Sequence, residues 1–433
     1  MQKRYLAVLS ALLMGAFSAG ISAGPLVTHA GTTGQVPPMG AMEAALAKGR
    51  QAVARRDFAA ADRQFQEAAA AAPGSPQPLL ELAESARIRG QGDQSKAWLD
   101  RAMALAPRDV DVMRALARWH YASGQHAEAE SRWKAALQVD RTHTGVLVDL
   151  ADFEFNVRGD LDAAAALYEK ALEANPSLPG ARYALGIMDL RRNRLEPALR
   201  NLQEAARLSP GNALPWVGIA QVYRQRGDRE KSLQAYGTAI KAQASYYPAH
   251  LERGELLLAR NPAKALEDFE QAIRVQPRSA EARVGAGMAL QMLKQPGKAL
   301  EQYQAAIVID PTNVIALNNA AWLASERKEL LDRALGWAVE AARLAPDRPE
   351  VQGTLAWVHH RRGDSAKALS LLQALIQASK KPRAESYFLL ARVHADRAEK
   401  DAASAALREA LKLDSNFPQA AEATALLRRL QGS

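Results

Sequence analysis

Apolar and small residues recur along this chain with a regular spacing, and polar residues fill the positions between them. The clearest copy of the pattern begins at Ala213 and contains, in order, Trp216, Ile219, Ala220, Tyr223, Ser232, Tyr236 and Ala239. Gly227-Asp228 interrupts the copy at a place suited to the end of one helix and the start of the next. A proline closes many copies, and proline stops a helix because it lacks the amide donor and clashes with the preceding turn. The pattern predicts two helices joined by a short turn.

The spacing of the closing prolines gives the length of one unit. The motifs are Ala72-Pro73, Ala106-Pro107, Asn175-Pro176, Ser209-Pro210, Gln276-Pro277, Asp310-Pro311 and Ala345-Pro346. The gaps from Pro73 to Pro107, Pro176 to Pro210 and Pro277 to Pro311 are each 34 residues. The gap from Pro107 to Pro176 is 69, one more than two units, and that from Pro210 to Pro277 is 67, one less. Eleven units therefore fit over residues 42–415, with Arg141, Ala244, Lys380 and Ser415 in place of proline in the weaker copies.

Small residues at two positions of the unit explain how its helices pack. At the eighth and twentieth positions they allow close approach, and an aromatic residue fills the space beside them. Such sets are Gly186 and Ala198; Gly254 and Ala265 with Phe269; and Gly287 and Ala299 with Tyr303. The Arg-Gly-Asp triplets at residues 158–160, 226–228 and 362–364 fall in the turn. There Gly suits a left-handed helix end and Asp suits a helix cap, so we interpret the triplets as structural rather than adhesive.

The unit resembles the tetratricopeptide repeat, whose pattern is W-x2-L-G-x2-Y, then A-x3-F, then P. The resemblance covers about 374 residues, because eleven units of 34 fit over residues 42–415. It implies an all-α fold, a right-handed superhelical solenoid of about eleven helix-turn-helix repeats. Residues 416–433 follow the array, and a helix over residues 418–430, with Arg428 and Arg429 on its exposed side, is expected to cap it.

The start of the chain predicts export. Residues 1–23 have the form of a signal peptide, with Lys3 and Arg4 before an apolar stretch and small residues around Ala23. Residues 24–41 contain Gly, Pro and Thr without periodicity, which predicts a flexible linker. No later apolar run is long enough to predict a transmembrane segment. Because the chain has no cysteine, we expect neither a lipid anchor nor disulfides. The predicted location is the periplasm.

Motifs that carry chemistry are missing from the sequence. No H-E-x-x-H or phosphate-binding glycine loop occurs, and a G-x-S-x-G match at residues 20–24 lies across the predicted cleavage region. His120, His359 and His394 fall on the eleventh repeat position, usually tyrosine, and are expected to pack rather than bind metal. We therefore expect no enzyme activity, cofactor or metal.

The resemblance implies that repeat positions 2, 5, 9, 12 and 13 face a concave groove that holds a partner. The candidate residues are Phe153, Tyr183, Ile187, Val217, Gln221, Val284, Met288, Asn318, Trp322, Trp357, His360 and Phe388. Trp322 and Trp357 lie one repeat apart at position 9, so we expect them to stack. Large aromatic residues on a concave surface are typical of binding. The alternative is that neighbouring hairpins bury these residues against each other. The Lys and Asn clamp that some family members use for acidic chain ends is not found at the matching positions.

The balance of charges and a narrower resemblance bear on the partner. The formal net charge is +9, with acidic and basic residues alternating, which indicates a solvated surface or an anionic partner. Residues 317–324, 341–347 and 354–358 resemble exported bacterial repeat proteins of exopolysaccharide export and PEP-CTERM systems. The sequence thus predicts a periplasmic scaffold for protein partners of an envelope assembly. The alternative is guidance of an anionic polysaccharide by a basic groove; export argues against nucleic acid.

Overall fold

The computed structural model describes residues 40–432, and every regular element in that range is a helix. The chain divides into a first unit that ends at Ser209 and a second unit that starts at Pro210. The predicted signal peptide and all but the end of the predicted linker lie outside the described residues. No helix within residues 40–432 is long and apolar enough to cross a membrane.

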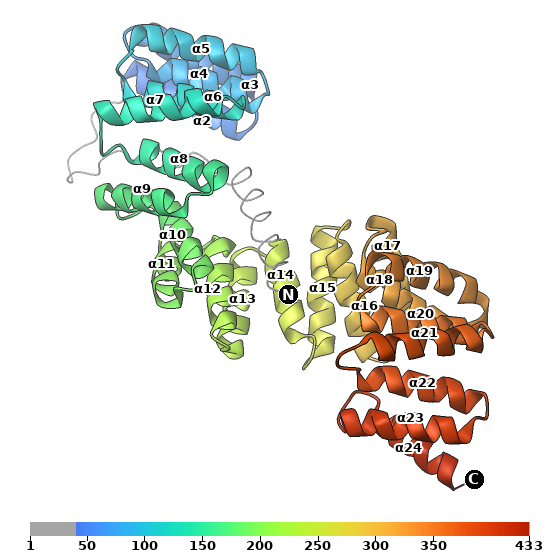
Figure 1. The fold of residues 1–433 in the computed structure, drawn as a ribbon. Helices are drawn as coiled ribbons and strands as arrows, with labels where there is room; N and C mark the ends of the chain where they lie inside the picture. The colour runs from blue at the N-terminus through green and yellow to red at the C-terminus, as the bar shows by residue number, and fades with distance from the viewer. Residues whose placement is uncertain (1–39, 433) are drawn as a thin grey trace. The chain divides into compact units, whose positions relative to one another are not determined.

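Five helical hairpins form the described part of the first unit (Figure 1). They are α2 (Ala41–Ala54) with α3 (Phe58–Ala71), α4 (Gln77–Ile88) with α5 (Gly92–Leu105), α6 (Val110–Ala122) with α7 (His126–Val139), α8 (Thr144–Phe153) with α9 (Leu161–Ala174), and α10 (Pro179–Arg191) with α11 (Leu195–Leu208). A π-helical turn, η1 (Glu154–Arg158), follows α8.

Six hairpins and a final helix form the second unit. The hairpins are α12 (Ala213–Gln225) with α13 (Arg229–Ala242), α14 (Tyr247–Leu257) with α15 (Pro262–Val275), α16 (Ala280–Met292) with α17 (Pro296–Ile309), α18 (Val314–Ser325) with α19 (Leu331–Leu344), α20 (Pro349–Arg361) with α21 (Ser365–Ala378), and α22 (Ala384–Asp396) with α23 (Lys400–Leu413). A 3-10 turn, η2 (Lys328–Leu330), precedes α19, and α24 (Ala420–Gln431) closes the unit. The described residues thus contain the eleven predicted repeats.

Within each unit, a hairpin packs on the next one along the chain, as in a helical solenoid. The two helices of a hairpin contact each other, and the second helix contacts the first helix of the following hairpin. First helices of successive hairpins also touch, as in the series α18, α20 and α22. This series places equivalent side chains of three repeats next to one another.

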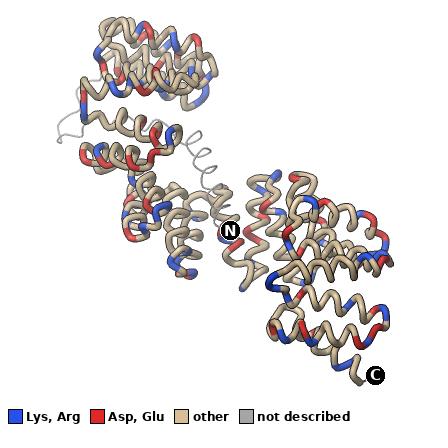
Figure 2. Tube along the Cα trace, viewed as in Figure 1, with Lys and Arg blue, Asp and Glu red and all other residues tan. Residues whose placement is uncertain are grey.

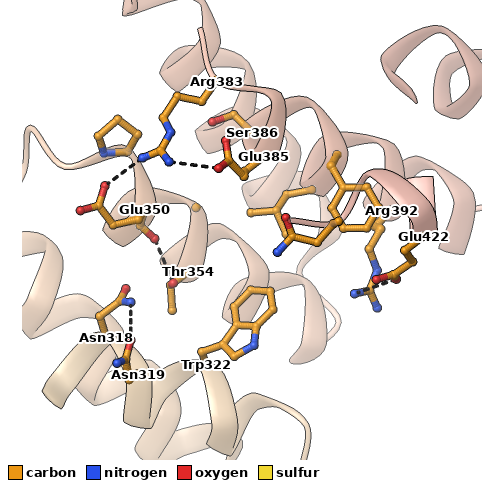
Figure 3. Close-up of a pocket in the computed structure, with 15 residues that line it drawn as sticks. Asn318, Asn319, Trp322, Glu350, Thr354, Arg383, Glu385, Ser386, Arg392 and Glu422 are labelled. Atoms are coloured by element: carbon orange, nitrogen blue, oxygen red, sulfur yellow. Dashed lines mark hydrogen bonds and ion pairs between the residues drawn. The ribbon is translucent and has the colours of Figure 1, made fainter. Parts of the chain in front are cut away.

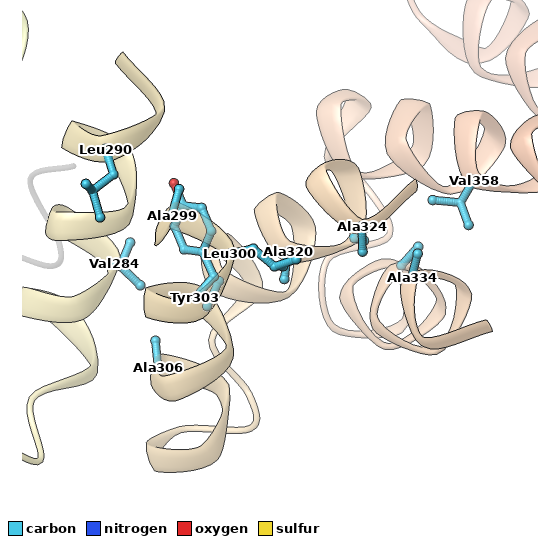
Figure 4. Close-up of a cluster of buried hydrophobic side chains, with 13 residues drawn as sticks. Val284, Leu290, Ala299, Leu300, Tyr303, Ala306, Ala320, Ala324, Ala334 and Val358 are labelled. Carbon is cyan, nitrogen blue, oxygen red and sulfur yellow. The ribbon is translucent and has the colours of Figure 1, made fainter. Parts of the chain in front are cut away.

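Glycines let the two helices of a hairpin approach, as the small positions of the repeat predict. A Cβ added at Gly287 would lie 2.6 Å from the ring of Tyr303, and one at Gly254 would lie 2.9 Å from the ring of Phe269. Tyr303 is fully buried and belongs to the cluster of Figure 4, in which Val284, Ala299 and Ala320 surround it. The aromatic ring thus occupies the space that the missing side chain leaves.

The turns between the helices confirm the structural interpretation of the Arg-Gly-Asp triplets. Gly159, Gly227 and Gly363 have φ angles of 68°, 80° and 95°, which non-glycine residues rarely adopt. The aspartate that follows each glycine accepts hydrogen bonds from backbone N–H groups at the start of the second helix; these caps are Asp160, Asp228 and Asp364.

The added residue between Pro107 and Pro176 has a structural counterpart in the first unit. The π-helical turn Glu154–Arg158 widens the end of the α8 helix, and such a turn takes up one residue more than an α-helical turn. The repeat length predicts that an extra residue exists, and the structure shows where it is placed.

The final helix, α24, begins two residues later than the sequence predicts and packs on α23. Ala423 is buried against the preceding hairpin, whereas Arg428 and Arg429 are exposed. The helix therefore covers the apolar end of the array with a polar outer face, as predicted.

Charged residues of both signs are interspersed along the described chain (Figure 2). Several of them link successive hairpins, because an arginine at the end of a first helix reaches an aspartate on the preceding second helix. These pairs are Arg89 with Asp62 at 2.7 Å, Arg192 with Asp162 at 2.5 Å, and Arg362 with Asp332 at 2.7 Å. Exposed pairs of this kind each contribute roughly 0–1 kcal/mol. Some of the charged surface residues are thus paired with each other within the array.

Candidate partner-binding site

In the first unit, the predicted groove residues are largely enclosed by their neighbours. Phe153 at the end of α8 is 3% exposed, and its ring centre lies 5.8 Å from that of Trp133 and 6.3 Å from that of Tyr121. Ile187 on α10 is also buried, and Tyr183 is half-buried. At Phe153 the structure therefore shows the mutual packing that the sequence left as an alternative, and Ile187 is buried as well.

Gln221 on α12 is engaged with the protein itself. Its side-chain amide donates to both oxygens of Glu252 on α14, at 3.0 and 3.1 Å, and the Tyr236 hydroxyl donates to the same carboxylate at 2.7 Å. All three side chains are buried, as are the predicted groove residues Val217 and Val284. Gln221 thus satisfies a buried carboxylate and links two hairpins.

Trp322 and Trp357 stack as predicted, but they differ in exposure. Their ring centres are 5.9 Å apart with an interplanar angle of 29°. Trp357 on α20 is fully buried, its indole N–H donates to Glu326 at 3.2 Å, and the guanidinium of Arg392 lies 4.2 Å from its ring centre. Trp322 on α18 is half-buried. Trp357 therefore packs against Trp322 inside the protein, and Trp322 is the more exposed of the two rings.

The remaining predicted residues of the second unit fall into different settings. His360 makes hydrogen bonds to Ser365 and Asp396, both at 2.9 Å, and so links α20 to α22. Phe388 on α22 is 3% exposed, and Met288 on α16 is 36% exposed. The His360 ring centre lies 5.2 Å from that of Trp357, and the Phe388 ring centre lies 5.8 Å from that of Phe417. Met288 belongs to an earlier hairpin.

A pocket of about 410 Å³ lies beside Trp322 (Figure 3). Its walls come from α18, α20, α22 and the start of α24 with the segment before it, and they include Asn318, Trp322 and Phe388 from the predicted set. Gly353 and Thr354 on α20 also line the pocket, and Leu389 packs against Gly353, 3.0 Å from where a Cβ would lie. The pocket brings three of the twelve predicted residues together.

Five charged side chains line this pocket, and they give it a net charge of −1 from three glutamates and two arginines. Arg383 donates to Glu385 at 3.0 Å and lies 3.6 Å from Glu350. Arg392 lies 3.7 Å from Glu422, in addition to its position over Trp357. Both guanidinium groups therefore already have acidic partners inside the pocket.

Two side-chain oxygens of the pocket lack hydrogen-bond partners. Asn318 Nδ2 donates to Asn319 Oδ1 at 3.3 Å, and Asn319 Nδ2 donates to the Tyr303 hydroxyl at 3.2 Å. Asn318 Oδ1 and Gln419 Oε1, in contrast, are buried and accept no hydrogen bond. A buried acceptor without a donor costs about 1–3 kcal/mol. Both oxygens are covered by the protein, so a ligand that brings donors reaches them only after the amide side chains rotate.

The histidines that the sequence predicts to be packing residues lie in the last turn of the first helix of their hairpins. His120 makes a hydrogen bond to Gln125 at 2.6 Å, and His394 makes one to Glu399 at 2.5 Å, in each case with the residue that precedes the second helix. Burial lowers the pKa of His359, against the opposing effect of Asp364. No group of three or more His, Cys, Asp or Glu that could hold a metal ion occurs within residues 40–432.

The charged residues of the pocket were not predicted from the sequence, although the repeat contains a signal for some of them. Glu350 and Glu385 occupy position 2 of their repeats and Arg392 occupies position 9, which are groove positions. From the sequence, charged residues such as these are interpreted as a solvated surface or as the mark of an anionic partner. Arg383 and Gln419 lie outside the repeat positions that predict a groove, so the pattern contains no signal for them.

Comparison with known families agrees with the repeat architecture. One tetratricopeptide repeat profile matches residues 114–179, 157–213, 217–261 and 259–314, and a second tetratricopeptide repeat profile matches residues 384–417. Together the matches cover more than half of the chain. The chain belongs to the tetratricopeptide repeat family.

Particular relatives include proteins from yeast and bacteria. The chain is 25% identical over 171 residues to anaphase-promoting complex subunit 3 of Schizosaccharomyces pombe, covering 39% of this chain and 26% of that protein. It is 26% identical over 370 residues to cellulose synthase operon protein C of Xanthomonas axonopodis pv. citri, covering 82% of this chain and 22% of that protein. The second similarity agrees with the expected resemblance to repeat proteins of exopolysaccharide systems. The chain spans about a quarter of the length of these two relatives.

Among solved structures, the crystal structure of the APC/C hetero-tetramer Cut9-Hcn1 is similar with a TM-score of 0.45 and 13% identity. The similarity covers 90% of this chain and 96% of the other.

Proposed function

We propose that this chain is a non-enzymatic scaffold, exported to the periplasm, that docks protein partners of an envelope assembly for exopolysaccharide export or secretion. The observation that carries the proposal is the pocket beside Trp322. It combines the aromatic ring of Trp322 on α18 with charged groups on or next to α20, α22 and α24, and with two buried acceptors that lack donors. A few convergent polar groups in an apolar pocket are typical of binding sites.

Two observations support the location and pathway. The first is the predicted signal peptide over residues 1–23. The second is the similarity to cellulose synthase operon protein C, which extends over 82% of this chain. Because the tetratricopeptide fold serves many unrelated partners, the pathway rests on these two observations and not on the fold.

The pocket favours a protein partner over the alternative of an anionic polysaccharide. Its three glutamates outnumber its two arginines, and both arginines have acidic neighbours. A polyanion would meet repulsion from the glutamates at this site. The net charge of +9 belongs to the chain as a whole and is not concentrated at the pocket.

Site-specific photo-crosslinking in the source organism tests the proposal. A photoreactive residue replaces Arg383 at the pocket rim, and a second version carries it at Val308 on α17, a position that is 83% exposed and outside the pocket. We expect the first version to capture an envelope protein, and Trp322→Ala to abolish the capture without changing the yield of the chain. The tagged chain is expected in the periplasmic fraction, with a new N-terminus after Ala23. Cytosolic location, or equal capture from both positions, would contradict the proposal.

A further inference from the structure

We propose that the pocket beside Trp322 selects a basic peptide segment of its partner, in which a lysine or arginine side chain with apolar neighbours enters the space between α18, α20 and α22. This inference rests on the proposed function and specifies the chemistry of the partner at the same site. It is the opposite of a clamp for acidic chain ends.

The charges of the pocket give the first argument. Arg383 has two glutamate neighbours, and Arg392 lies between the Trp357 ring and Glu422, so neither guanidinium is left to attract an acid. The contacts to Glu350 and Glu422 are long, at 3.6 and 3.7 Å, and these two side chains are 48% and 58% exposed. Glu350 also lies 3.8 Å from Arg348, so Glu422 is the carboxylate with a single long contact and the better acceptor for an incoming cation. The net charge of −1 of the pocket lining favours such a cation.

The unsatisfied acceptors give the second argument. Asn318 Oδ1 and Gln419 Oε1 need donors, and the Asn318 amide nitrogen already donates to Asn319. Lysine and arginine side chains consist of donors only and have no acceptor to repel these oxygens. A rotation of either amide side chain toward the pocket lets it accept from such a group, which recovers part of the cost of burial.

The aromatic wall gives the third argument. In Figure 3 the ring of Trp322 extends from α18 into the space bounded by Thr354 and Arg392. Its support by the buried Trp357 ring fixes this orientation. A long aliphatic stem packs well on such a ring, and a cation over an indole face gains about 0.5–2 kcal/mol. A volume of about 410 Å³ suits one long side chain with its immediate neighbours better than a whole helix.

The test uses the full chain without its predicted signal, and a phage-displayed library of random twelve-residue peptides as the probe. We expect the selected peptides to share a lysine or arginine beside an apolar residue. Binding of a synthetic peptide from this set is expected to weaken as salt rises, because the pairs are partly exposed. Trp322→Ala is expected to weaken binding on the order of tenfold to a hundredfold, as for a central interface residue.

Matched glutamate variants separate the pocket from the general surface. Glu422→Gln and Glu350→Gln are each expected to weaken binding about two- to fivefold. Glu340→Gln removes a glutamate on α19 that is paired with Arg343 outside the pocket, and it is expected to leave binding unchanged. Circular dichroism of each variant checks that the helices are intact. A peptide in which glutamine replaces the basic residue is expected to bind the wild type, Glu422→Gln and Glu350→Gln equally.

The outcomes distinguish this inference from the function on which it rests. Acidic or neutral selected peptides that still depend on Trp322 would overturn the basic selectivity but leave the docking function standing. Peptide binding that ignores every pocket variant, or binding of an anionic oligosaccharide in preference to peptides, would overturn both.

Discussion

The surroundings of Phe153 and of Trp322 show how the same repeat can close or keep open its groove positions. Phe153, in the first unit, is enclosed by Trp133 and Tyr121 and is 3% exposed. Trp322, in the second unit, is half-buried and lines a pocket of about 410 Å³. Both residues were predicted to face a partner from the same helix of their hairpins.

The difference arises from the volume and polarity of the neighbours. Large rings surround Phe153, whereas the pocket beside Trp322 is lined in part by the small residues Gly353, Thr354 and Ser386. The buried amide of Gln221 is satisfied by Glu252, but the buried oxygen of Asn318 is not satisfied. A repeat position thus fixes the direction of a side chain, and its neighbours decide whether it serves stability or binding.

The largest expected effect is the loss of stability on removing the enclosed ring. Phe153→Ala should lower the local opening free energy of α8 by about 3–5 kcal/mol, because the structure cannot fill the cavity. Trp322→Ala should lower that of α18 by less, since its ring is only half-buried. Amide hydrogen exchange resolves the two helices, which a single unfolding curve of a repeat array does not. Equal losses in the two variants would contradict the distinction.

A second prediction tests whether the hairpin beside the pocket is as tightly packed as the others. Gly287→Ala places a Cβ 2.6 Å from the Tyr303 ring, so it should destabilise the second unit by about 1–3 kcal/mol. Gly336→Ala is the matched control, because no neighbouring atom lies within 4 Å of its added Cβ. It should be neutral or stabilise α19 by up to about 1 kcal/mol, as alanine favours helices. Urea unfolding followed by circular dichroism measures both variants. A Gly287→Ala variant as stable as the wild type would show that α16 and α17 are not tightly packed here.

A third prediction compares the satisfied amide with the unsatisfied one. Gln221→Leu should destabilise by about 1–3 kcal/mol, because the buried Glu252 loses a donor. Asn318→Leu should change stability by less than about 1 kcal/mol, because it removes one long hydrogen bond together with a buried oxygen that has no partner. The same urea titration compares the two. A larger loss for Asn318→Leu would indicate that this residue is structural.

The last prediction is a pH dependence of stability near Phe153. Burial raises the pKa of Asp152 to about 7, and Asp149 adds to this, while a hydrogen bond from Tyr168 and the charges of Arg118 and Arg114 oppose it. In the unfolded chain the Asp152 carboxyl ionises near pH 4. Between pH 4 and pH 7 the folded protein therefore binds this proton more tightly than the unfolded chain does. The free energy of unfolding should fall from pH 4 to pH 7 and then level off. Asp152→Asn should flatten this slope in a urea titration at several pH values. A wild-type slope of the opposite sign would contradict the assignment.

The sequence predicts the framework better than the site, for a physical reason. The repeat pattern reveals features that are local or act between adjacent helices. These are the 34-residue spacing, the close approach of the helices at Gly287 and the helix cap at Asp228. The pocket depends on small residues of one hairpin lying opposite large residues of another, which no single repeat contains. Gln419 enters it from the segment before α24, outside the repeat altogether.

The most direct test of the central claim is hydrogen exchange of the full chain with and without the partner captured at Arg383. The account predicts that slowed exchange is concentrated in α18, α20 and α22 and disappears in Trp322→Ala. It also predicts no change around Phe153 in α8. Protection centred on α8, or protection of α18 to α22 that survives Trp322→Ala, would contradict the account.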